Sequence, residues 1–139
     1  MLLLLSTFSA LAAVYADFLD VDELSDAADR VVLGEVSAVE SRRVPGGIVT
    51  DVTVDVSDTL LGTPTPAITL TLPGGRINRE TLTVSGVPRL LVGHDLLLFM
   101  EDDRPVSLSQ GIFFVDGSLA YSATHSAPIP LEEVRRILY

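Results

Sequence analysis

Residues 48–58, IVTDVTVDVSD, alternate apolar and polar side chains more regularly than any other part of this 139-residue chain. A strand that buries one face and exposes the other requires this period of two, and antiparallel sheets commonly contain such strands. One face then carries Ile48, Val52, Val54 and Val56, and the other carries mainly Val49, Asp51, Thr53, Asp55 and Ser57. The stretch therefore predicts a half-buried antiparallel strand.

The segment before it, residues 30–40 (RVVLGEVSAVE), is rich in β-branched side chains and also predicts a strand. The two segments are separated by SRRVPGG, in which Pro45 fixes φ while Gly46 and Gly47 free it for a tight turn. We therefore expect a hairpin formed by residues 31–41 and 48–58.

Shorter apolar segments follow, and breakers separate them. Residues 67–72, 81–85, 106–116 and 118–123 predict strands, and the continuous run LLLFM at 96–100 predicts a strand covered on both faces. A helix is expected from Asp20 to about Asp29, capped by Asp20 with Glu23 reaching back, and another over residues 130–139. The pattern predicts a mainly β fold: a small antiparallel barrel of five to seven strands with short N- and C-terminal helices.

The first sixteen residues, MLLLLSTFSALAAVYA, are uncharged and almost wholly apolar or small. This is typical of a secretory signal with cleavage between Ala16 and Asp17, which leaves a single domain over residues 17–139. A signal normally opens with Lys or Arg, and here none precedes the apolar run. The alternatives are a start placed too far downstream, an uncleaved membrane anchor, or a buried element.

Charge and cysteine content narrow the classes of function. The chain has nineteen acidic and nine basic residues, a net charge of −10, and no lysine. Acidic residues spread along the chain argue against nucleic acid as a partner, because its phosphates require clustered cations. The absence of cysteine excludes disulfides, thiolate metal sites and a cysteine nucleophile. Together with the N-terminal segment, it predicts a protein secreted or periplasmic in a bacterium.

Few residues are candidates for catalysis or metal binding. His94 and Asp95 are adjacent between two apolar runs, and Gly93 before them favours a turn, so we interpret the pair as part of a turn between strands. His94 and His125 are 31 residues apart with no further ligand at metal-binding spacing, and we expect neither a metal nor another cofactor. Ser109 in SLSQG resembles a nucleophile elbow that lacks its first glycine, which is a weak match.

Five segments taken in order resemble a known domain: ADRVVLGEVSAVES, TDVTVDVSDTLLG, ITLTLPGG, VGHDLLLFM and SLSQGIFFV. They are similar to the netrin-like, OB-type barrel, the fold of the tissue inhibitors of metalloproteinases and of many secreted bacterial proteins. The resemblance covers Ala28 to Val115 and implies the barrel fold. Those inhibitors place an N-terminal cysteine amine on the protease zinc, whereas the expected mature terminus here is Asp17, so the resemblance carries over no inhibitory residue.

Three functions remain open at this point. The first is an exported, non-enzymatic domain that binds a protein partner such as an extracellular protease or an envelope protein. The second is a structural domain tethered to the membrane by an uncleaved N-terminal segment, and the third is a small hydrolase using Ser109. In an OB-type barrel the loop between the first two strands is a customary binding edge, and here it contains Arg42, Arg43, Gly46 and Gly47. The competing interpretation is that the arginines only solubilise the end of a hairpin.

Overall fold

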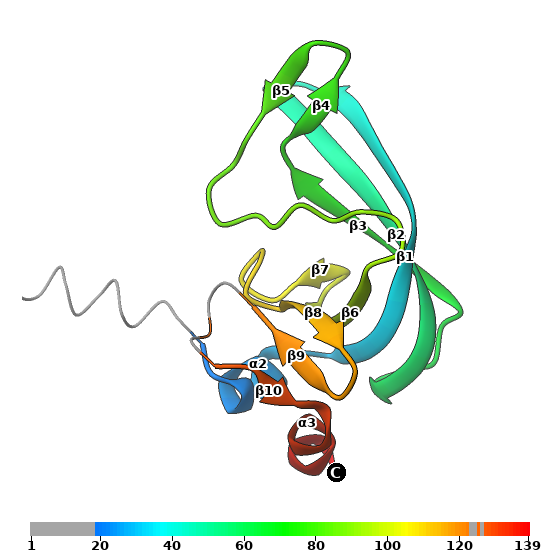
Figure 1. Ribbon diagram of the computed structural model, residues 1–139, viewed down its shortest axis with the longest axis vertical. Coiled ribbons are helices and arrows are strands. Elements are labelled where there is room, and N and C mark those ends of the chain that lie inside the picture. Colours follow the sequence, from blue (N-terminus) through cyan, green and yellow to red (C-terminus); the bar gives the residue numbers. More distant parts are fainter. Residues whose placement is uncertain (1–18, 123–124, 126) are drawn as a thin grey trace, which may run out of the picture.

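The computed structural model describes residues 19–122, 125 and 127–139, and in this part of the chain the fold is mainly β (Figure 1). The predicted fold class and the two short flanking helices are confirmed. The expected signal segment, with Ala16 and Asp17 at its cleavage site, lies outside the described residues. Among the described helices, none is both long enough and apolar enough to cross a bilayer.

A long hairpin dominates the molecule. Strand β1 (Arg30–Val44) pairs antiparallel with β2 (Gly47–Leu61), and both extend beyond the predicted limits. Only Pro45 and Gly46 separate the strands, and Gly46 has a φ of 93°. The turn is therefore tight enough for the strands to pair up to Val44 and Gly47 on either side of it. Three register shifts interrupt the pairing between Val31 and Ala38, in the first part of β1. At one of them Gly34 has no room for a side chain, because a Cβ would lie 2.5 Å from the carbonyl oxygen of Asp55.

The main sheet extends from this hairpin in both directions, in the order β10-β9-β8-β6-β1-β2-β3, with every adjacent pair antiparallel. Its other strands are β3 (Ala67–Pro73), β6 (Asp95–Glu101), β8 (Ile112–Asp116), β9 (Leu119–Tyr121) and β10 (Ile129–Pro130), and the short β7 (Arg104–Pro105) also pairs with β6. A separate hairpin consists of β4 (Gly75–Ile77) and β5 (Glu80–Leu82).

The sheet does not close into the expected barrel. Within the described residues, β3 and β10 are the two ends of the strand order and do not pair with each other. Gly74, with a φ of 93°, turns the chain away from the sheet directly after β3. The chain then forms the β4–β5 hairpin, and the following 83–94 segment contains no strand. The result is an open, curled sheet.

Strand β6 separates two apolar clusters, as its continuous apolar run predicted. Leu96, Leu98 and Met100 pack on one face with residues of β1, β2 and β3. Leu97 and Phe99 pack on the opposite face, which is covered by helix α2 (Val21–Ala27) and helix α3 (Leu131–Leu138). All five side chains are at most 3% exposed, which accounts for the absence of polar residues in this run.

The segment 106–116 departs from the predicted strand. Residues 106–111 form a tight loop, and the strand begins only at Ile112. The carbonyl of Phe99 accepts a hydrogen bond from the amide of Val106, and the amide of Phe99 donates to the carbonyl of Gly111. The loop is therefore an insertion opposite a single residue of β6. Periodicity does not reveal it, because apolar residues flank it on both sides.

Candidate functional site

His94 closes a turn, as predicted, whereas Asp95 is already the first residue of β6. Gly93 has a φ of 96°, and the amide of His94 donates to the carbonyl of Leu91 at 3.1 Å. The His94 Nδ1 atom accepts a hydrogen bond from the amide of Leu91 at 3.0 Å, and its ring packs edge-on against Phe114. The imidazole thus stabilises its own turn.

The two histidines contact opposite faces of β8. His94 packs against Phe114, whereas the ring centroid of His125 lies 5.1 Å from that of Phe113. Phe113 and Phe114 are consecutive in a strand and belong to different apolar clusters. Among the described residues, no group of three or more acidic or histidine side chains is placed to hold a metal ion.

Ser109 lies in the inserted loop, where its amide donates to the carbonyl of Ser107 at 2.8 Å. The loop is followed by β8. A nucleophile elbow requires a helix at this place, so the local geometry of Ser109 differs from that motif.

The arginines predicted for a binding loop lie near the tip of the β1–β2 hairpin, and both form ion pairs. Arg42 Nε lies 2.7 Å from an oxygen of Asp51, and Arg43 lies 2.7 Å from Glu80 of β5. Hydrogen bonds from Arg42 and from the hydroxyl of Thr71 hold the pKa of Asp51 below its ordinary value. The pKa of Glu80 is lowered by its hydrogen bond from Arg43. The Arg42 pair links the two strands of the hairpin, and the Arg43 pair joins the tip to β5. Gly46 lies in the turn and Gly47 begins β2.

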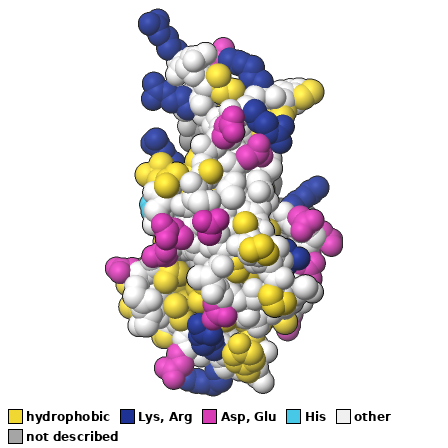
Figure 2. Space-filling model, turned by 90° about the vertical axis from the view of Figure 1, so that its right-hand side faces the viewer, with side chains coloured by type: hydrophobic (Ala, Val, Ile, Leu, Met, Phe, Trp, Pro, Cys, Tyr) yellow, Lys and Arg dark blue, Asp and Glu magenta, His cyan; other side chains and the backbone are white. Residues whose placement is uncertain are grey.

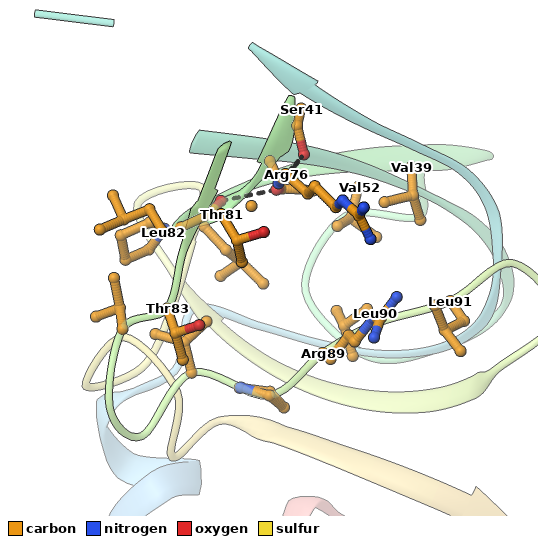
Figure 3. A pocket seen from close by; sticks show the side chains of 18 residues that line it. Val39, Ser41, Val52, Arg76, Thr81, Leu82, Thr83, Arg89, Leu90 and Leu91 are labelled. Carbon is orange, nitrogen blue, oxygen red and sulfur yellow. Dashed lines mark hydrogen bonds between the residues drawn. The ribbon is translucent and has the colours of Figure 1, made fainter. Parts of the chain in front are cut away.

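A groove lies beside this tip, with a cavity volume of about 380 Å³. We use "the groove" for this cavity, which is lined by residues of β1, β2, β3, β4 and β5 and of the 83–91 segment (Figure 3). Its size lies within the range of pockets that bind small molecules or peptide side chains. The sequence did not predict it, because the lining residues come from segments as far apart as Val39 and Leu91.

A polar network fixes one wall of the groove. The hydroxyl of Thr50 donates to the carbonyl of Gly74 at 2.8 Å and lies 2.9 Å from the hydroxyl of Ser41. The Ser41 oxygen in turn accepts a hydrogen bond from the amide of Arg76 at 3.3 Å. At Gly75, a Cβ would lie within 2.5 Å of both hydroxyl oxygens, so only glycine lets β4 approach this closely. These contacts hold the β4–β5 hairpin against β1 and β2.

Exposed apolar side chains are concentrated at the groove. Val39, Leu82 and Leu91 line it and are 37%, 39% and 48% exposed. The described residues include seven large apolar side chains with at least this exposure, and three of them line the groove. Exposed apolar side chains around a cavity are typical of a place where another molecule binds.

Two arginines missing from the sequence-based prediction also line the groove. Arg76 extends from β4 and Arg89 from the 83–91 segment, and Figure 3 shows both side chains reaching the same opening. A charge pattern in the sequence marks this region: residues 59–94 contain three arginines and one glutamate, a net charge of +2 in a chain of −10. Figure 2 shows dark blue side chains gathered at the end of the molecule that carries the β4–β5 hairpin.

Comparison with known proteins adds no assignment: no protein-family model matches the chain, and no curated protein matches it significantly in sequence.

Proposed function

We propose that this protein is an exported, non-enzymatic binding domain that holds an extended segment of a protein partner in the groove. The observation that best supports this proposal is that exposed apolar side chains line a cavity of about 380 Å³. Burial of such side chains by a ligand is favourable by about 25 cal/mol per Å² of apolar surface removed from water. The partner is an extracellular protease or an envelope protein, in keeping with export to the periplasm or exterior of a bacterium.

A protein segment fits this groove better than a nucleic acid or an anionic membrane surface. The net charge of −10 repels both of those polyanions at long range. The groove is lined by parts of five strands and the 83–91 segment, and an extended peptide that presents alternate side chains to such a surface is a recurring mode of peptide recognition. We also propose kinship with the netrin-like domains, supported by the curled antiparallel sheet, its long first hairpin and the two terminal helices.

The test is affinity selection with a soluble library of random octapeptides carrying free C-termini. The protein, in its native processed form, is immobilised, and the retained peptides are identified by mass spectrometry and titrated individually. We expect retained peptides to be rich in apolar residues. The Leu82→Asp/Leu91→Asp variant should bind them at least tenfold more weakly, because it places two carboxylates in the apolar wall.

The matched control is Tyr139→Asp, which changes another exposed apolar residue (82% exposed) that is not among the groove residues. It should bind the retained peptides like the wild type, and urea unfolding verifies that all variants are folded. The proposal is wrong if no peptide is retained, or if the groove variant and the control bind the retained peptides equally well.

A further inference from the structure

The groove is lined by positively charged residues, whereas the molecule as a whole is negatively charged. Its lining residues include two arginines, Arg76 and Arg89, and no aspartate or glutamate, although the sequence has nineteen acids and nine bases. A ligand that reaches this surface meets cations over an apolar wall. The groove is therefore suited to a group that is both anionic and next to a hydrophobic side chain.

The two arginines differ from those at the hairpin tip. Arg42 and Arg43 are neutralised by Asp51 and Glu80, whereas neither Arg76 nor Arg89 forms an ion pair with any residue in the described part of the chain. Both are exposed and accessible to a ligand. Arg76 is held in place, because its Nε donates to the carbonyl of Asn78 at 3.2 Å and its amide to Ser41. Its terminal guanidinium nitrogens then remain available as donors.

Two guanidinium groups are well matched to a carboxylate. Each presents donors in a fixed planar fork, and such pairs form short, charge-assisted hydrogen bonds. The apolar residues Val39, Leu82 and Leu91 lie in the same small cavity. One ligand residue must therefore supply a carboxylate and an apolar side chain within a short distance of each other.

The last residue of a peptide meets this requirement by itself, because its α-carboxylate and its side chain share one Cα atom. An acidic segment is a poorer fit, since each additional carboxylate is repelled by the net charge of −10. We propose that the groove captures the C-terminal end of its partner, with Arg76 and Arg89 binding the terminal carboxylate and the apolar wall receiving the last side chain. This inference rests on the proposed function.

The test uses the retained octapeptides, each resynthesised as the free acid, as the C-terminal amide, and as an amide with one internal aspartate. Affinities are measured by isothermal titration calorimetry for the wild type, Arg76→Gln, Arg89→Gln and Arg79→Gln. Arg79 is the matched control, because it is an exposed arginine in the same β4–β5 hairpin but does not line the groove. The titrations are repeated at two salt concentrations.

We expect the free acid to bind about tenfold more tightly than the amide, and each groove arginine variant to lose about fivefold to tenfold in affinity for the acid. Amide binding should be nearly the same in all four proteins, and only acid binding should weaken with salt. Arg79→Gln should behave as the wild type.

Equal binding of acid and amide would overturn the inference while leaving the proposed function intact, provided that the Leu82→Asp/Leu91→Asp variant still loses affinity. Tighter binding of the internal aspartate peptide than of the free acid would also overturn it, and would assign the arginines to an acidic side chain. Retention of no peptide at all would contradict both proposals.

Discussion

The two ends of the β1–β2 hairpin have similar strand sequences but different surroundings. At the base, Val31 and Val32 are fully buried, because β6 pairs beside β1 and the two helices cover the outer face. Towards the tip, Val39 is 37% exposed, and polar contacts join the hairpin to β4 and β5. One pair of strands thus provides part of the buried core at one end and one wall of the groove at the other. The alternation that builds a strand does not determine what covers it.

The comparison predicts that stability depends mainly on the base. Phe99→Ala removes a fully buried ring that packs edge-on against Phe113 at 5.7 Å, and we expect a loss of about 3 to 5 kcal/mol in the free energy of unfolding. Leu82→Ala in the groove should change it by less than about 0.5 kcal/mol. Urea denaturation followed by circular dichroism measures both.

Phe99→Leu provides a milder test if Phe99→Ala fails to fold, and it should still cost more stability than Leu82→Ala. A loss for Leu82→Ala as large as that for either Phe99 variant would show that the groove belongs to the folding core. The division between base and tip would then be wrong.

The sequence predicted the base better than the tip, for a physical reason. A strand covered on both faces must be apolar throughout, so the run at 96–100 predicted its own burial. The capping box of α2 was also predicted correctly, since the Asp20 side chain accepts a hydrogen bond from the amide of Glu23 at 2.8 Å. Both features depend on residues that are neighbours in the chain.

The groove could not be predicted in this way, because it depends on where the chain returns after β3. Closure of the sheet was expected from strand count, yet Gly74 turns the chain outwards and the 83–94 segment contains no strand. The same sequence-based approach singled out Arg42 and Arg43 from their loop position, and their ion pairs depend on Asp51 and Glu80 in other strands. Net charge over residues 59–94 is the signal that would have indicated the groove.

A smaller effect is expected from the polar network at the tip. Thr50→Val removes the hydroxyl that donates to the carbonyl of Gly74, and leaves that oxygen without this partner. We expect a loss of about 1 kcal/mol in stability. The β4–β5 hairpin should also be held less firmly, so affinity for the retained peptides should fall as well.

Thr69→Val is the matched control, because Thr69 is exposed on the neighbouring strand β3. Urea denaturation and peptide titration of both variants separate stability from binding. If Thr50→Val binds peptides as tightly as Thr69→Val does, the network does not shape the groove.

The smallest effect concerns the exposed ion pair between Arg42 and Asp51, whose side chains are 53% and 29% exposed. The hydrogen bonds from Arg42 and Thr71 lower the pKa of Asp51 in the folded protein below its ordinary value of 3.8. Asp51 therefore contributes stability that is fully present above pH 3.8 and is lost as the pH falls through the lower, folded pKa. Asp51→Asn should be slightly less stable than the wild type at pH 7, and the difference should shrink when urea denaturation is repeated towards pH 3.

The cost of Phe99→Ala arises from a cavity, so it should stay constant over the same range. A difference for Asp51→Asn that is equally independent of pH would mean that the tip, like the base, is stabilised by packing rather than by charge.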